Sequence, residues 1–237
     1  MKTIQHLTKS HQSPFTNIPI SLYIHLPWCL RKCPYCDFYS EVAIKDTWEF
    51  LETNYIQALT QDLDRELLHI QERELISIFI GGGTPNLFSP QAIRKLLTHI
   101  RTRCKTKSEV EITMEANPGV VDHQCFADYR DVGVNRLSIG VQSFHDHLLK
   151  RLGRIHSAKE AEQAMVLAKD ADFKNINLDI MYGLPGQTLQ FALRDLEIAI
   201  QNRPQHISWY KLTIVLISDF TMSTCPNTQI ISILPII

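Results

Sequence analysis

The chain has 237 residues, of which 44% are hydrophobic and 21% are charged. This ordinary globular balance excludes a wholly disordered, collagen-like or coiled-coil chain. Because 24 Lys and Arg residues stand against 25 Asp and Glu residues, no basic excess indicates nucleic acid as a partner. The stretch 1–16 lacks the apolar core of a secretory signal, and no apolar run is long enough to span a membrane. We therefore expect a cytoplasmic protein without a membrane span.

Six short runs rich in β-forming residues alternate with helical patterns along the chain. The runs are Ile20–Leu26, Leu75–Ile80, Val110–Glu115, Arg136–Val141, Ile176–Ile180 and Ile207–Thr213. The helical patterns are an apolar stripe from Trp48 to Leu67, a helix capped by Ser89 before Pro90, a short helix over Gln124–Val132, a capping box of Ser157 and Glu160, and a helix that begins at Thr188. This alternation predicts βαβ units and a parallel sheet, either doubly wound or an incomplete barrel.

Polar or reactive residues follow five of the predicted strands. Cys29 follows the first strand, the run Gly81–Pro85 ends the second, and Glu115 ends the third. Gln142 ends the fourth strand, and Asp179 lies near the end of the fifth. Parallel α/β folds bind ligands at the carboxyl ends of their strands. A turn or a solvated strand end explains any one of these residues as well, but the alignment of all five predicts a single ligand site.

Three cysteines, Cys29, Cys33 and Cys36, form a C-x3-C-x2-C pattern. In a chain without a signal peptide, such a cluster indicates metal or redox chemistry more often than disulfide bonds. Structural zinc needs four ligands, whereas a [4Fe-4S] cluster held by three cysteines leaves one iron open. Arg31 and Lys32 are expected to favour the thiolate forms. An iron–sulfur cluster is the favoured interpretation, while zinc and a disulfide with one spare thiol stay open.

The cysteine pattern after a first strand resembles that of the radical S-adenosylmethionine (SAM) superfamily. Within this superfamily, the runs Tyr23–Cys29, Gly81–Pro85 and Ile139–Phe144 are similar to the oxygen-independent coproporphyrinogen III oxidase group, and there to the HemW haem chaperones. The resemblance extends over Ile18–Ile214. It implies an α/β fold, namely a partial (β/α)6 barrel of the TIM type that is open at its C-terminal edge.

The resemblance also implies cofactors and the residues that bind them. Cys29, Cys33 and Cys36 would hold a [4Fe-4S] cluster, and SAM would exchange at the open iron. Arg154 would pair with the SAM carboxylate, acidic side chains would accept hydrogen bonds from the SAM amino group or ribose, and glycines would let the backbone approach the ligand. The residues implied to bind SAM are Tyr23, Tyr35, Gly82, Gly83, Thr84, Glu115, Gln142, Arg154 and Asp179.

Two functions stay open within this resemblance. The oxidases carry a fourth cysteine two places after the third, where this chain has Phe38. They also carry a longer N-terminal segment, whereas 22 residues precede Tyr23 here. Both differences favour a HemW-type chaperone that binds haem or a related tetrapyrrole and hands it to an acceptor protein. The alternative is a radical SAM enzyme of porphyrin biosynthesis, so whether the chain is an enzyme stays open. No residue is assigned as a haem ligand.

The resemblance divides the chain into an N-terminal segment (1–19), the barrel (20–214) and a tail (215–237). The tail holds one charged residue, Asp219, and its apolar end has no partner in the predicted pattern. We therefore expect a premature end that removes the C-terminal region of the family. Such an end would expose one barrel edge and make the tail prone to aggregation.

Overall fold

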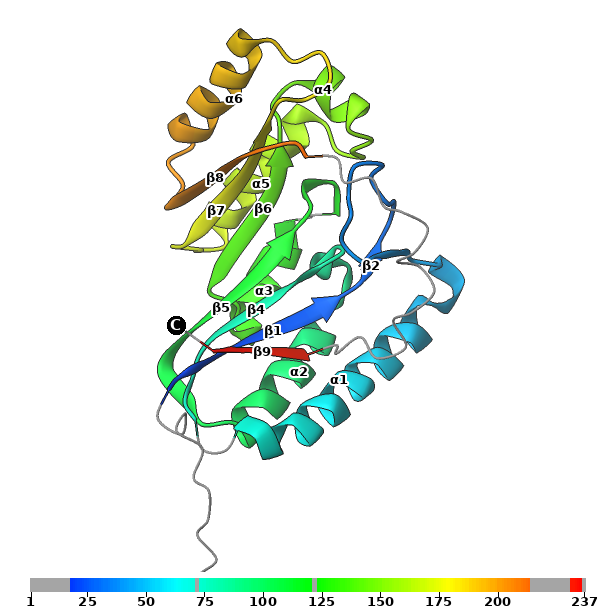
Figure 1. Cartoon of the computed structure of the whole chain (residues 1–237), viewed down its shortest axis with the longest axis vertical. Coiled ribbons are helices and arrows are strands. Elements are labelled where there is room, and N and C mark those ends of the chain that lie inside the picture. Colours follow the sequence, from blue (N-terminus) through cyan, green and yellow to red (C-terminus); the bar gives the residue numbers. More distant parts are fainter. Residues whose placement is uncertain (1–17, 71–72, 121–122, 214–230, 236–237) are drawn as a thin grey trace, which may run out of the picture.

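The structure, a computed structural model, describes residues 18–70, 73–120, 123–213 and 231–235, with side chains at all of them except 123–125 and 231–235. At its centre is a curved seven-stranded sheet in the order β8-β7-β6-β5-β4-β1-β9 (Figure 1). The strands are β1 (Ile20–Leu26), β4 (Leu75–Gly82), β5 (Thr106–Ala116), β6 (Arg136–Gln142), β7 (Ile176–Tyr182), β8 (His206–Lys211) and β9 (Ile231–Pro235). The strands from β8 to β1 are parallel, and β9 is antiparallel to β1. Two short strands, β2 (Trp28–Cys29) and β3 (Glu41–Val42), pair separately.

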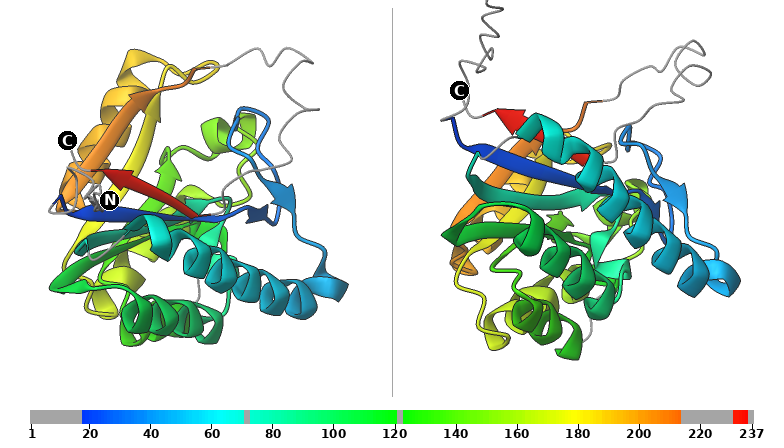
Figure 2. Two further views of the ribbon diagram at one scale, coloured as in Figure 1. Left: turned by 60° about the horizontal axis from the view of Figure 1, so that its bottom comes forward. Right: turned by 90° about the horizontal axis from the view of Figure 1, so that it is seen from below.

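Helices cover the outer face of this sheet (Figure 2). They are α1 (Trp48–Ile70), α2 (Pro90–Arg103), α3 (His123–Val132), α4 (Asp146–Arg151), α5 (Ala158–Asp170) and α6 (Leu189–Gln201). Short 3-10 helices occupy Lys45–Thr47, Pro85–Leu87 and Pro118–Val120. None of the helices in the described ranges is both long enough and apolar enough to cross a membrane.

The sheet order confirms the predicted partial barrel, because β1 and β8 lie apart in the order and do not close it. The predicted helix starts are also found. The side chain of Ser89 accepts a hydrogen bond from the Ala92 backbone at the start of α2, and Ser157 and Glu160 form the predicted capping box of α5. Thr188 caps α6. The short helix α4 was not predicted, because six residues are too few to show a helical period.

The two faces of the sheet differ in polarity. On the outer face, Ile24 and its alternating neighbours in β1 are buried in the core together with Leu59 of α1. On the opposite, inner face, several buried strand residues are polar, namely Thr113, Ser138 and Asn177. The amide of Asn177 donates to the Ser138 hydroxyl at 2.8 Å, so these groups are satisfied by one another. This layer of hydrogen-bonded polar groups lies beneath the carboxyl ends of the strands.

At one edge of the parallel strands, β9 pairs with β1. The pairing runs from Ile20 opposite Pro235 to Ile24 opposite Ile231. The expectation of an apolar tail end without a partner is therefore wrong for 231–235, because open backbone groups on an edge strand can accept another strand. The tail residues 215–230 and 236–237 lie outside the described residues.

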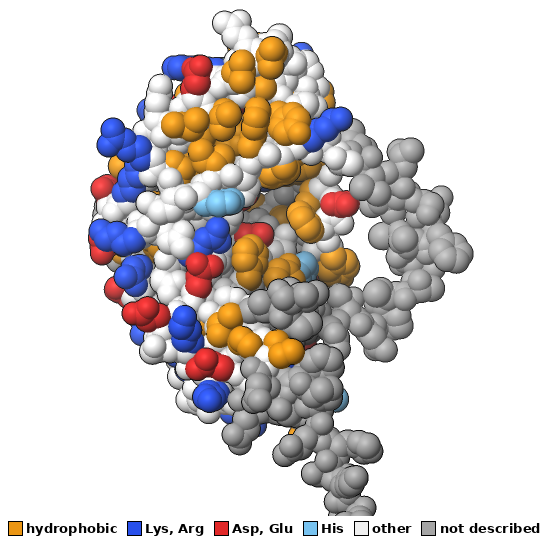
Figure 3. All heavy atoms as spheres, turned by 60° about the vertical axis from the view of Figure 1, so that its left-hand side comes forward, with side chains coloured by type: hydrophobic (Ala, Val, Ile, Leu, Met, Phe, Trp, Pro, Cys, Tyr) orange, Lys and Arg blue, Asp and Glu red, His pale blue; other side chains and the backbone are white. Residues whose placement is uncertain are grey.

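At the other edge, β8 has β7 as its single neighbour among the described strands. Figure 3 shows hydrophobic side chains gathered over the end of the molecule that α6 and β8 form. Exposed apolar residues of these elements include Leu193, Ile200 and Trp209. The β8 end of the sheet is therefore its apolar and unpaired end within the described part of the chain.

Candidate functional site

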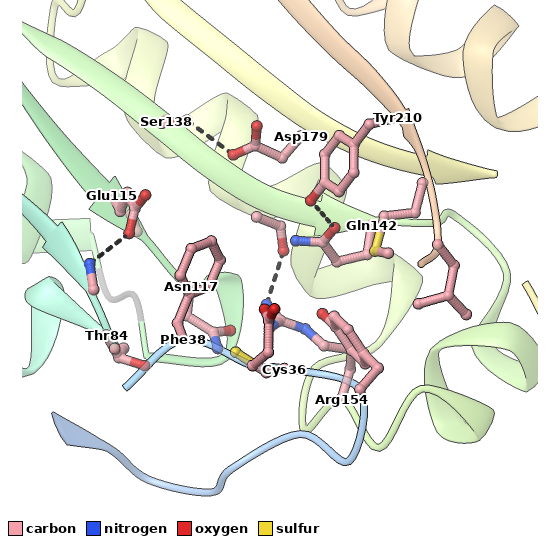
Figure 4. Close-up of a pocket in the computed structure, with 18 of the residues that line it drawn as sticks. Cys36, Phe38, Thr84, Glu115, Asn117, Ser138, Gln142, Arg154, Asp179 and Tyr210 are labelled. Atoms are coloured by element: carbon pink, nitrogen blue, oxygen red, sulfur yellow. Dashed lines mark hydrogen bonds between the residues drawn. The ribbon is translucent and has the colours of Figure 1, made fainter. Parts of the chain in front are cut away.

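A cavity of about 340 Å³ opens at the carboxyl ends of β4 to β8. The strands contribute side chains or backbone to its wall in turn: Gly82 from β4, Glu115 from β5, Gln142 from β6, Asp179 from β7 and Tyr210 from β8. The loop after β2 closes another side with residues 35–38 (Figure 4). Because all these strands are parallel, their ends meet at one rim, as the sequence indicates.

Most of the residues that were predicted to bind SAM meet at this cavity. Those that line it are Tyr35, Gly82, Gly83, Thr84, Glu115, Gln142, Arg154 and Asp179. Tyr23 is not among the lining residues. Its hydroxyl lies 2.9 Å from Nδ1 of His25, and its ring stacks on Phe79 with a centroid distance of 6.1 Å. Tyr23 therefore packs against its neighbours His25 and Phe79 and does not line the cavity.

The three clustered cysteines lie on the loop beside the cavity. Cys36 lines the cavity, and its backbone N–H donates to the carbonyl of Cys33 at 3.0 Å. The sulfur of Cys33 lies 3.8 Å from Nη1 of Arg154, which is itself a cavity residue. Cys29 is fixed by the pairing of β2 with β3. Cys36 thus lies at the cavity, Cys33 lies beside a residue of its wall, and Cys29 lies in β2 at the start of the same loop.

The donor set fits a cluster better than a single ion. In the described ranges, no three His, Cys, Asp or Glu residues are grouped so that they could hold one metal ion. A four-iron cluster is bound by cysteines at different irons, so its ligands need not converge on one point. Burial raises the pKa of the Cys36 thiol, and Lys32 offsets only part of this rise. The charge of Lys32 acts in the expected direction, towards the thiolate, although burial outweighs it at Cys36.

Two carboxyl groups line the cavity from β5 and β7 (Figure 4). Oε2 of Glu115 accepts a hydrogen bond from the Gly82 backbone at 3.0 Å. Burial raises the pKa of Glu115 to about 7; the Gly82 hydrogen bond opposes this rise and the charge of Asp179 adds to it. The Asp179 carboxylate accepts from the Ser138 hydroxyl at 2.8 Å and from the Asn177 amide at 3.0 Å. This acidic wall favours a cationic ligand group.

Hydrogen-bond donors lie on another side of the cavity, where Figure 4 shows Arg154 and Gln142 away from Glu115. Nη2 of Arg154 donates to the Gly140 carbonyl at 2.9 Å, while its Nε is buried and has no partner among the described residues. Oε1 of Gln142 accepts from the Tyr210 hydroxyl at 2.9 Å, which leaves the Gln142 amide N–H groups as donors. The cavity therefore offers carboxylates on one side and a guanidinium on another.

The glycines at the end of β4, Gly82 and Gly83, have a structural reason that the sequence did not reveal. Gly82 has φ +116°, and a Cβ there would lie 2.7 Å from the His25 ring. A Cβ on Gly83 would lie 2.6 Å from the Trp28 carbonyl oxygen. Close packing of the protein on itself thus requires both glycines. Approach of a ligand, which was the expected reason, is not needed to explain them.

Several cavity residues were missed from the sequence. They include Phe38, Asn117, Ser138, Met181, Tyr210 and Lys211. Asn117 and Lys211 follow or end strands, so the strand-end rule could have found them. Ser138 lies in the middle of β6, and Phe38 belongs to the cysteine loop, so no periodic signal marks either residue.

Comparisons with known proteins agree with this geometry. The family model of the radical SAM superfamily matches residues 23–196. The heme chaperone HemW of Escherichia coli (strain K12) is 53% identical over 196 residues, which cover 83% of this chain and 51% of that protein. The heme chaperone HemW of Haemophilus influenzae is 52% identical over 200 residues, with coverage of 83% and 51%. The chain therefore spans about half the length of the curated relatives it matches.

A solved structure extends the comparison to the fold. Coproporphyrinogen III oxidase (HemN) from Escherichia coli, described as a radical SAM enzyme, matches with a TM-score of 0.77 and 25% identity, covering 85% of this chain and 46% of that chain. The resemblance to HemW that the motifs indicated is confirmed by the relatives, and the partial barrel is confirmed by the solved structure. On the match of its family model, the chain belongs to the radical SAM superfamily.

Proposed function

We propose that this chain holds a [4Fe-4S] cluster on Cys29, Cys33 and Cys36, binds SAM in the adjoining cavity, and carries haem to an acceptor protein. The observation that carries the proposal is the junction of the cysteine loop with the cavity, where Cys36 and Arg154 both line the wall. Relatives named heme chaperone HemW, at up to 53% identity, support the chaperone function.

The charges around the cavity suit the amino-acid end of SAM. SAM carries an ammonium group and a carboxylate at that end, and the cavity has Glu115 and Asp179 in one part and Arg154 in another. The unpartnered Nε of Arg154 is a buried donor that a ligand carboxylate would satisfy. An ammonium group beside Glu115 would favour the ionised carboxylate, which burial disfavours in the free protein. Both charged groups at the amino-acid end of SAM thus have a complementary partner.

The chain's residues would hold and orient these groups, whereas the bound cluster would supply the electron that can cleave the SAM sulfonium. The loop that bears the cysteines is anchored at both ends. The backbone N–H of Ala43 donates to the carbonyl of Cys29 at 2.8 Å, and that of Glu41 donates to the carbonyl of Pro27 at 2.8 Å. This pairing would hold the two ends of the cysteine loop together.

The haem part of the proposal rests on the relatives. They are named heme chaperones, and this chain matches about half of their length. We assign no haem ligand among the described residues and leave the acceptor protein unidentified. A cytoplasmic location stays a prediction from the sequence.

A second candidate function is oxidation of coproporphyrinogen III, because the solved oxidase shares this fold with a TM-score of 0.77. Phe38, at the place where the oxidases carry a fourth cysteine, argues against it. Phe38 is 65% exposed and lines the cavity. Turnover of coproporphyrinogen III by the reconstituted protein with SAM and a reductant, under anaerobic conditions, would favour the oxidase over the carrier.

Metal analysis after anaerobic reconstitution tests the cluster. We expect about four iron and four sulfide per chain, as in other [4Fe-4S] proteins. The variants Cys33→Ser and Cys36→Ser should lose most of the iron. Cys104→Ser is the matched control, since Cys104 is a half-buried cysteine that caps α2 and should leave the iron content unchanged. Equal iron in Cys36→Ser and Cys104→Ser would refute the assigned ligands.

Titration with ferric haem, followed by absorbance, tests the cargo separately. A saturable change at about one haem per chain would support the carrier. An absorbance change that never saturates, measured on protein that has taken up its cluster, would contradict haem transport. It would leave the cluster assignment intact.

A further inference from the structure

Gln142 lies at the centre of an unusual turn at the end of β6. Its φ is 67°, a left-handed value for a residue that is not glycine. The backbone N–H of Ser143 donates to the carbonyl of Val141 at 2.9 Å, so Val141, Gln142 and Ser143 form a three-residue turn. A γ-turn with positive φ at its centre is the rare and strained form. Strain of this kind persists only when surrounding contacts impose it.

The turn directs the Gln142 side chain into the cavity, where its Oε1 meets the Tyr210 hydroxyl (Figure 4). Gln142 is nearly fully buried, and a Cβ on Gly140 would lie 3.0 Å from its Nε2. If the turn relaxed to an ordinary extended conformation, the side chain would leave this place, because successive residues of a strand point to opposite faces. The strained φ therefore fixes where Gln142 presents its amide.

His156 holds the turn from the chain that follows α4. Its Nε2 lies 3.1 Å from the Val141 carbonyl, the same oxygen that accepts from Ser143. Because a carbonyl can only accept, Nε2 carries the proton. His156 is 3% exposed and is not among the residues that line the cavity. Its hydrogen bond therefore reaches the site through the backbone of the turn, and Arg154, two residues before it in the chain, lines the cavity.

Asp195 holds the other end of the turn from the middle of α6. Its carboxylate is fully buried and accepts from the Ser143 hydroxyl at 2.8 Å and from the Phe144 backbone at 2.7 Å. The amide of Gln187 donates to it at 3.3 Å. This buried carboxylate fixes the Phe144 backbone and the Ser143 side chain, because losing either bond leaves a buried charge poorly satisfied. Asp195, like His156, does not line the cavity.

We infer that His156 and Asp195 are positioning residues that hold the strained turn and thereby place Gln142 to contact the ligand of the cavity. The inference rests on the proposal that this ligand is SAM. The two residues act from different elements on the two sides of Gln142, so each is expected to contribute. We expect their effect on the ligand to pass mainly through Gln142, the cavity residue that the turn places.

A double-mutant cycle tests whether the effect of His156 and Asp195 on SAM binding depends on Gln142. We expect His156→Leu and Asp195→Asn each to weaken SAM binding to the reconstituted protein about tenfold. In a Gln142→Ala background, the same changes should alter SAM affinity less than about twofold, since the side chain they place is gone. His156→Gln, which keeps an N–H donor, should restore most of the affinity. Losses that are the same in both backgrounds would overturn the inference.

The matched control is Asp146→Asn. Asp146 is a carboxylate in the same connection between β6 and α5, and it accepts from the Ala158 backbone at 2.7 Å without touching the turn. Its replacement should leave SAM affinity unchanged. If Asp195→Asn does not fold, Ser143→Ala removes one of the same hydrogen bonds and takes its place in the cycle.

An NMR measurement without SAM separates this inference from the proposed function. Selective labelling of glutamine should give a contact between the Gln142 side-chain amide and the Tyr210 ring in the wild type and in Asp146→Asn. We expect that contact to be lost in His156→Leu and Asp195→Asn. Its persistence in both variants would overturn the inference even if SAM binds, whereas its loss would support the positioning role even if the wild type binds no SAM.

Discussion

Replacing Glu115 with Gln should change how the stability of the chain depends on pH. Burial raises the pKa of Glu115 from 4.5 to about 7 in the folded chain, and the charge of Asp179 adds to that rise. A group whose pKa is higher in the folded state stabilises the fold when it is protonated in both states, that is, below its unfolded pKa. This contribution is lost as the pH rises from the unfolded pKa through about 7, because the unfolded chain releases the proton while the folded chain still holds it.

The size of the effect follows from the same two pKa values. For a single group that shifts from 4.5 to about 7, the free energy of unfolding should fall by about 2–3 kcal/mol between pH 5 and pH 8. A Gln at this position has no proton to lose, so Glu115→Gln should remove most of that fall. The amide oxygen can still accept the hydrogen bond from Gly82, so the fold itself should be kept.

Urea unfolding at several pH values, without added iron, sulfide or SAM, measures the difference. We expect the wild type to lose stability between pH 5 and pH 8 by about 2–3 kcal/mol more than Glu115→Gln does. Glu162→Gln, at an exposed position on α5, is the matched control and should behave as the wild type does. Parallel pH curves for the wild type and Glu115→Gln would refute the assignment of a buried, neutral carboxyl group at the cavity.

Three further changes test the packing around the site. Gly83→Ala should destabilise the chain by about 1–3 kcal/mol in thermal unfolding, because the new Cβ would lie 2.6 Å from the Trp28 carbonyl oxygen. Gly119→Ala is the control and should lose less stability, because the nearest atom to its new Cβ is on a side chain at 3.1 Å. Ser89→Ala should lower stability by about 1 kcal/mol in the same assay, since it removes the cap of α2. Removal of β9 by truncation before Ile231 should speed amide exchange along β1 and increase aggregation, and unchanged exchange would contradict the pairing.

The sequence predicted the parts of the fold that depend on local pattern. Alternating strands and helices, and capping residues such as Ser157, gave the order of elements, and parallel strands then bring their ends together whatever the details of packing. That is why Glu115 and Asp179 could be assigned to one rim before the cavity was known. The strand-end rule does not apply to Tyr23, because this residue lies within β1, before the end of the strand. Its contacts with His25 and Phe79 decide how it packs.

Features that depend on contacts between distant segments could not be predicted. The identity of Gln142 does not predict its positive φ. The turn there depends on hydrogen bonds from His156 and Asp195, which belong to other elements. The partner of β9 is likewise a strand at the opposite end of the chain. In the sequence, Asn177 interrupts the apolar pattern of its strand. Its role appears only from its hydrogen-bond partners, Ser138 and His206, on the neighbouring strands.

The most direct test of the central claim is electron paramagnetic resonance of the chain, reconstituted anaerobically with iron and sulfide, reduced, and measured with and without SAM. Three cysteines that leave one iron open, next to a cavity with Glu115 and Arg154 in its wall, predict a reduced [4Fe-4S] signal that changes when SAM is added. A signal that is indifferent to SAM, or no cluster at all, would contradict the assignment of this cavity as a SAM site beside an iron–sulfur cluster.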